Sequence, residues 1–181
     1  MTMKHILKIF LIISSVILIA GCRKNYVISE RQRILFQYEY INDTRENRHY
    51  GFFIDNEGNV LTYDNPVEWN FPDKDLNITE NQVDENISRC IISGKTIPVE
   101  ELMKFSNFIE NISSSKVTAV KNSGTDTGKS VFICYQFFEG TGTYKGYLIK
   151  MEGDSSCENL NFYSKKVTLW MKEIGDTISI K

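Results

Sequence analysis

Residues 34–41 read ILFQYEYI, and this stretch decides what kind of fold the chain adopts. Within it, Ile34, Phe36, Tyr38 and Tyr40 alternate with their neighbours. Because successive side chains of an extended strand point to opposite faces, this spacing predicts a strand with these four residues on one face. We therefore expect the folded domain to begin with a β-strand.

A second strand and a hairpin follow closely. Residues 49–55 are again rich in apolar and aromatic side chains, and the segment DNEGN at 55–59 leads into the apolar pair at 60–61. Gly58 supplies the positive φ of a short turn. The segment carries calcium-type oxygen ligands, but its glycine is fourth, whereas an EF-hand loop needs glycine sixth. A hairpin turn is the better interpretation.

Helical and strand patterns occupy separate regions of the remaining chain. Thr79 and Gln82 have capping-box spacing at the start of a helix expected over 79–91. Apolar residues at helical spacing predict further helices over 98–112 and 160–174. The other expected strands are 116–121, 130–139 and 144–151. The grouping indicates the α+β class, with an antiparallel sheet of about five to six strands and two or three helices packed on one face.

Composition and the N-terminal segment set the class and location of the protein. The 181 residues are 41% hydrophobic and 24% charged, which excludes collagen, coiled coil and disordered tail. Residues 1–21 carry two lysines and then a dense aliphatic run, the order of a secretory signal. An uncleaved anchor is the alternative, but a span needs about 20 apolar residues and this run is shorter. We expect a signal peptide over 1–21, a lipidated tether over 22–30 and one α+β domain over 31–181.

The segment IAGC at 19–22 resembles the bacterial lipobox. The resemblance implies cleavage between Gly21 and Cys22 and a diacylglyceryl group on the Cys22 thiol, with no other cofactor. Arg23 and the residues after it match neither the inner-membrane retention signal nor the acidic surface-export signal of lipoproteins. The resemblance therefore implies an outer-membrane anchor facing the periplasm. The expected partners are the membrane and an envelope protein.

No catalytic, metal or nucleotide motif stands out in the sequence. His49 is the one histidine beyond the signal segment, so a metal site built on a histidine pair is excluded, and we interpret it as a polar residue at a strand edge. The segment 124–130, GTDTGKS, is similar to a phosphate-binding loop, but it is one residue short and a strand pattern follows it. We therefore interpret the segment as a hairpin turn and expect neither nucleotide nor nucleic acid as a partner.

The cysteines and one aromatic loop remain as candidate sites. With Cys22 acylated, three thiols remain in an oxidising compartment, and one disulfide is expected. The pair Cys134–Cys157 would close a loop of about two dozen residues; Cys90–Cys157 and three reduced thiols are alternatives. One aromatic loop is a tentative partner-binding site, because loops carry function more often than the elements that they join. Core packing of the same residues is the favoured alternative. The residues of this loop are Tyr63, Trp69 and Phe71.

Two stretches carry a family resemblance. They are YGFFID at 50–55 with GNV at 58–60, and GTYKGYL at 142–148, which continues to the WMKEI helix at 170–174. Together with the lipobox, they resemble the small lipoproteins common in Bacteroides-type bacteria. The resemblance implies location and architecture and no particular activity.

The leading hypothesis is a membrane-anchored, non-catalytic binding or interaction module of the periplasm, because no catalytic constellation is visible. The alternative is a lipoprotein inhibitor or immunity factor that neutralises a toxin or hydrolase. A third class is a hydrolase with paired carboxylates. A pocket with two close acids would favour that class.

Overall fold

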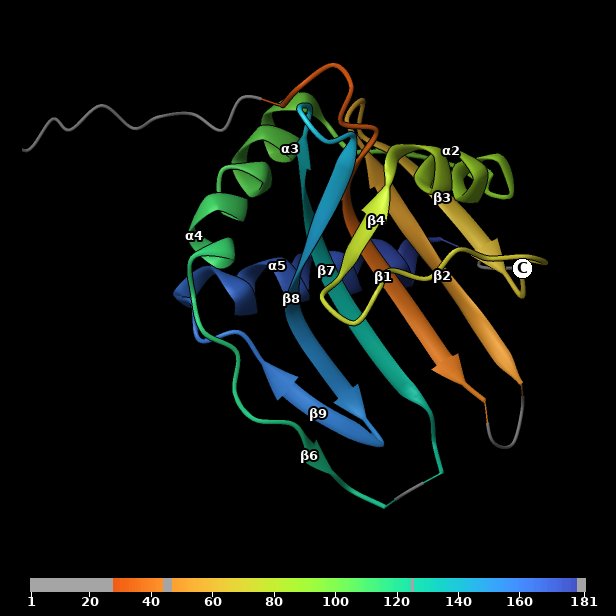
Figure 1. The fold of residues 1–181 in the computed structure, drawn as a ribbon, viewed down its shortest axis with the longest axis vertical. Coiled ribbons are helices and arrows are strands. Elements are labelled where there is room, and N and C mark those ends of the chain that lie inside the picture. The colour runs from red at the N-terminus through yellow and green to blue at the C-terminus, as the bar shows by residue number, and fades with distance from the viewer. Residues whose placement is uncertain (1–27, 44–46, 125, 179–181) are drawn as a thin grey trace, which may run out of the picture.

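A computed structural model describes residues 28–43, 47–124 and 126–178, and Figure 1 shows its ribbon. The strands are β1 (Ile34–Asn42), β2 (Arg48–Asp55), β3 (Asn59–Asp64), β4 (Asn77–Thr79), β5 (Ile91–Thr96), β6 (Lys121–Asn122), β7 (Lys129–Phe138), β8 (Thr143–Gly153) and β9 (Ser155–Glu158). The helices are α2 (Glu80–Ser88), α3 (Val99–Ser106), the five-residue α4 (Ile109–Ser113) and α5 (Phe162–Thr177). The predicted signal peptide, with Gly21 and Cys22, lies outside the described residues.

All nine described strands belong to one antiparallel arrangement. The strand order is β5-β3-β2-β1-β7-β8-β9-β6, and β4 pairs with the start of β8. The predicted α+β class and the antiparallel sheet are confirmed. The sheet is larger than the five to six strands expected, because the short strands β4, β5 and β9 were not predicted.

The predicted first strand lies at the centre of the sheet, between β2 and β7. Its alternation holds from Phe36 onward, where Phe36 and Tyr38 pack on one face and Gln37 lies on the other. A register shift between Ile34 and Phe36 breaks the pattern, so that Ile34 joins the core on the opposite face. The expectation that Ile34 shares a face with Phe36 was therefore wrong.

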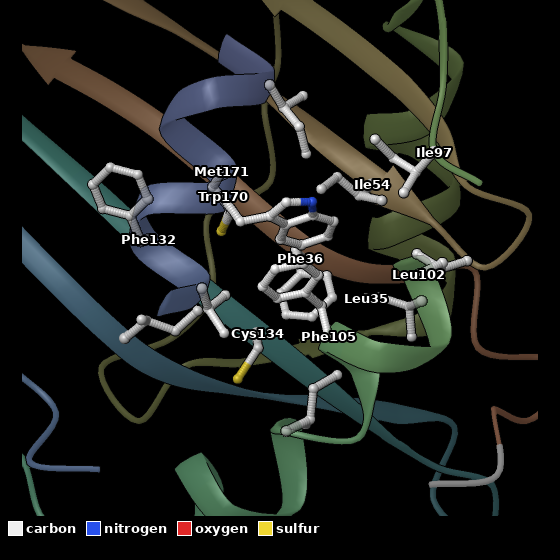
Figure 2. Close-up of a cluster of buried hydrophobic side chains, with 14 of the residues drawn as sticks. Leu35, Phe36, Ile54, Ile97, Leu102, Phe105, Phe132, Cys134, Trp170 and Met171 are labelled. Atoms are coloured by element: carbon white, nitrogen blue, oxygen red, sulfur yellow. The ribbon is translucent and has the colours of Figure 1, made fainter. Parts of the chain in front are cut away.

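Two hydrophobic cores lie on opposite faces of the sheet. On the first, Trp170 of α5 stacks on Phe105 of α3 with ring centroids 4.0 Å apart and meets Phe36 of β1 edge-on at 5.2 Å. Figure 2 shows this aromatic group among the surrounding aliphatic side chains. The second core contains Val83 of α2 and Tyr63 of β3. The helices were expected on one face, but α2 packs on the face opposite α5 (Figure 1).

Some local sequence patterns form the predicted element in full, and others form it only in part. The capping box at Thr79 and Gln82 is present, with both reciprocal hydrogen bonds formed. The helix expected over 98–112 is divided into α3 and α4, and Phe108 at the break stacks on Tyr163 of α5 at 4.1 Å. The strand expected over 116–121 is reduced to β6 and one isolated bridge at Val117.

Candidate functional site

The aromatic loop folds back onto His49. The centroid of the His49 ring lies 5.3 Å from that of Tyr63, 5.5 Å from that of Trp69 and 5.0 Å from that of Phe71. Tyr63 is 2% exposed, and Trp69 stacks on Phe53 at 5.6 Å, so both belong to the second core. Phe71 is 52% exposed. This packing supports the core alternative for Tyr63 and Trp69 and leaves Phe71 as the accessible member.

A chain of buried polar groups lies beneath this loop. The Nε2 atom of His49 is 3.1 Å from a carboxylate oxygen of Glu39, and their side chains are 14% and 7% exposed. Beside them, the Gln37 amide donates to Tyr63 Oη at 3.0 Å and accepts from Tyr135 Oη at 2.5 Å. These partners were missed from the sequence, although the alternation in 34–41 places Gln37 and Glu39 together on one face. Because each group has a partner, the cluster stabilises the second core.

The three described cysteines are all free thiols, and the predicted Cys134–Cys157 disulfide is not formed. Cys134 pairs across to Tyr147 of β8, whereas Cys157 pairs to Met151 on the other side of β8. Two strand spacings separate their backbones by about 10 Å, and a disulfide needs Cα atoms within about 7 Å. Burial also raises the pKa of the Cys134 and Cys157 thiols, which disfavours their reactive thiolate forms.

The segment that is similar to a phosphate-binding loop is a turn between strands. β7 begins at Lys129, so the Lys-Ser pair already lies in a strand, and the strand expected from the sequence is present in place of a helix. The backbone N–H groups of Thr127 and Gly128 donate to the Asp154 carboxylate at 2.7 and 2.8 Å. The amides that would hold a phosphate are therefore occupied by an internal carboxylate. The Asp55 carboxylate likewise accepts from the backbone of Glu57 in the β2–β3 turn.

A cavity of about 270 Å³ lies between α5 and the β1, β2, β7 and β8 part of the sheet, and we call it the α5 cavity. Two of its lining residues, Ser130 of β7 and Gly175 of α5, are small and leave this space open. Aromatic rings form most of its apolar lining. They belong to Tyr38, Tyr50, Phe52 and Phe132.

Polar groups converge on the same cavity. Tyr38 Oη and Ser130 Oγ lie 3.3 Å apart. Glu152 binds Lys150 Nζ at 2.8 Å and also binds Lys172 Nζ. Burial raises the pKa of the Glu152 carboxyl, but the hydrogen bonds from the two lysines outweigh burial and hold it below its ordinary value. Glu152 is therefore ionised at neutral pH.

The α5 cavity also bears on the paired-carboxylate hypothesis, because Glu152 and the exposed Asp176 both line it. A general acid needs a carboxyl whose pKa is raised toward neutrality. Glu152 is shifted in the opposite direction by its lysine partners. Glu152 therefore lacks the proton that a general acid must donate.

A second hollow, of about 470 Å³, adjoins the first, because Lys172 lines both. Its wall includes Leu160 and Phe162, which are 64% and 74% exposed. Within residues 28–43, 47–124 and 126–178, no three His, Cys, Asp or Glu side chains gather in a way that could hold a metal ion. None of the described helices has the length and apolar character needed to cross a bilayer.

Comparisons with protein families, with curated proteins and with solved structures find no match. The α5 cavity is the candidate site, because aromatic walls, hydroxyl groups and a fixed ion-pair cluster meet there.

Proposed function

We propose that the chain is a membrane-anchored lipoprotein that acts as a non-catalytic binding module, with the α5 cavity as its ligand site. One observation supports the binding site: four aromatic rings, a pair of hydroxyl groups and an ion-paired carboxylate surround the same cavity. Aromatic walls with a few convergent polar groups are typical of small-molecule sites.

The charges around the cavity favour a neutral ligand. Glu152 and Asp176 contribute two negative charges, and Lys150 and Lys172 offset them, so the group carries no net charge. A volume of about 270 Å³ is small for a ligand pocket. The aromatic faces suit an apolar ring face, and the polar groups suit hydroxyl groups at its edge. We infer that the ligand class is a neutral, polyhydroxylated ring of about monosaccharide size.

Filling the cavity should abolish binding. We expect ligand-observed NMR to detect at least one neutral sugar from a panel of glucose, galactose, mannose and N-acetylglucosamine. Ser130→Ile places an aliphatic side chain in the cavity and should abolish the signal. Ser130→Ala leaves the space open and removes one hydroxyl, so the affinity should fall about tenfold or less. Sugar binding unchanged in Ser130→Ile, or no sugar bound by the wild-type protein, would contradict the assignment.

The anchor is tested separately from the ligand site. Cys22→Ala removes the thiol that the lipobox resemblance identifies as the acylation point. We expect the variant to incorporate no radiolabelled palmitate and to leave the membrane fraction, because acyl chains supply the membrane affinity. A Cys22→Ala protein that is still acylated would exclude this anchor and would leave the ligand site unaffected.

A further inference from the structure

Apolar and basic side chains lie together on the exposed side of α5. Leu160, just before the helix, and Phe162 and Leu169 within it are 64%, 74% and 51% exposed. All three line the hollow of about 470 Å³, and Lys165 lines it with them. The Nζ atom of Lys166 lies 4.8 Å from the centre of the Phe162 ring. We call these five residues the α5 patch.

The charge of this region is opposite to that of the whole chain. The patch itself carries two lysines and no acid. Beside it, Lys150 and Lys172 bind one carboxylate, that of Glu152, so one positive charge is left over. The lining residue Glu158 offsets that charge. The region therefore has two excess positive charges, whereas the chain has a net charge of −2.

The stability of α5 does not explain where its charges are placed. Lys165 and Lys166 lie near the start of the helix, whereas its acids, Glu173 and Asp176, lie near its end. The helix dipole favours acids at the start and bases at the end. α5 has no acid in its first turn and no base in its last turn. This order opposes the dipole, so a contact outside the domain is the better reason for the basic patch.

We propose that the α5 patch docks on an anionic phospholipid surface. Leu160, Phe162 and Leu169 then enter the headgroup layer, and the two lysines contact lipid phosphates. Phenylalanine and leucine beside lysine on one helix face are typical of segments that lie in a membrane interface. Lysine suits this position, because its apolar stem covers hydrocarbon while its ammonium group stays at the headgroups. The excess positive charge of the region is complementary to the lipid phosphates.

The length of the tether supports a bilayer as the occupant. Here the inference rests on the proposed lipid anchor, though not on the ligand of the α5 cavity. Cys22 precedes Ile28, the first described residue, by six positions, which span at most about 21 Å. Ile28 packs against the first core, which lies on the face of the sheet that α5 covers. An anchored domain therefore keeps this face near the bilayer, where a weak contact is populated through its high effective concentration.

Quenching of fluorescence by brominated lipids tests the contact. The full chain is purified from membranes and reconstituted in vesicles. In Phe162→Trp, we expect brominated phosphatidylcholine with about one-third phosphatidylglycerol to quench about half of the added fluorescence, because the new ring enters the lipid. Adding Lys165→Gln and Lys166→Gln should lower the ratio of docked to undocked molecules about 30-fold, since each lysine near an anionic surface contributes about a fivefold factor.

Two further variants are matched controls. Val67→Trp places the same probe at a residue that is 78% exposed, in the loop that continues to Trp69 of the second core. Because the second core lies on the opposite face of the sheet, this probe should not be quenched. Lys74→Gln with Lys95→Gln removes the same charge from exposed lysines outside the patch, and should leave the quenching of Phe162→Trp unchanged.

Flotation of the vesicles in a density gradient separates the patch from the anchor. A Phe162→Trp protein that floats with the vesicles but is quenched no more than Val67→Trp would overturn the docking face and leave the anchor in place. Quenching that persists without Lys165 and Lys166, or that falls equally without Lys74 and Lys95, would also overturn it. A protein that does not float with the vesicles would overturn the anchor and this inference together.

Discussion

Gly51→Ala should lower the free energy of unfolding by about 4 kcal/mol or more, the range reached only by severe steric or packing defects. Gly51 lies in β2 between β1 and β3, opposite Glu39 and Tyr63. A Cβ atom at this position would lie 2.0 Å from the Tyr38 carbonyl oxygen and 2.6 Å from Tyr63 Oη. Neither can move freely, because Tyr38 is part of the central strand and Tyr63 is buried.

The expected loss of stability arises because the Tyr63 hydroxyl occupies the space that a Cβ atom on Gly51 would take. Tyr63 Oη accepts from the Gln37 amide at 3.0 Å and donates to the Tyr38 carbonyl at 3.3 Å. A methyl group would displace this hydroxyl and break its hydrogen bond from the Gln37 amide, which is 2% exposed.

Urea unfolding followed by circular dichroism measures the effect on Gly51, and Gly140→Ala is the matched control. A Cβ atom on Gly140 meets no atom within 4 Å, so that change should alter the free energy of unfolding by less than about 1 kcal/mol. A Gly51→Ala protein as stable as the Gly140→Ala protein would show that the sheet yields at this point and would refute the steric explanation.

The elements with a strong local signal could be predicted from the sequence. The strand at 34–41, the β2–β3 hairpin and the helix of 160–174 all follow the spacing of their apolar residues. β5 could not be predicted in this way. Its isoleucines continued the helical spacing after Ile87, and only pairing with β3 makes the segment a strand. The helical spacing was misleading there, because β-branched isoleucines favour a strand and β3 offers one to pair with.

The candidate site was harder to predict, because it is assembled from distant parts of the chain. The α5 cavity takes residues from β1, β2, β7, β8 and α5, and their proximity depends on strand order. The same dependence on strand order explains why the predicted disulfide is not formed. Cys134 and Cys157 are suitably spaced in sequence, but β8 lies between their strands. The aromatic loop was recognised by composition, whereas its packing on His49 depends on the pairing of β2 with β3, the strand that leads into the loop.

Alkaline solution should unfold the domain between about pH 10 and 11.5. Burial raises the pKa of the Cys90 thiol from 9.0 to about 12 and that of Tyr144 from 10.0 to about 12. Burial also raises the pKa of Cys134, and it raises those of Tyr63 and Tyr135 well above 10.0. Each group stays neutral in the folded protein at a pH where the unfolded chain already loses the proton.

The sign of the effect follows from proton linkage. Below pH 9 these groups are protonated in both states and do not affect the pH dependence. Above its unfolded pKa, each group favours the unfolded state by about 1 kcal/mol for each further pH unit, until its folded pKa is reached. Five such groups acting together near pH 11 approach the total stability of an ordinary domain, about 5–15 kcal/mol.

Cys90→Ala separates this mechanism from general charge repulsion. At neutral pH the variant should be less stable than the wild type, because Cys90 packs against the second core. Between pH 9 and 12 the difference in unfolding free energy should shrink by about 1 kcal/mol for each pH unit, since the variant lacks the titrating thiol. Chemical denaturation at pH 7, 9, 10 and 10.5 measures the difference directly. A constant difference across this range would show that Cys90 titrates alike in both states and would remove burial of its thiol as a cause.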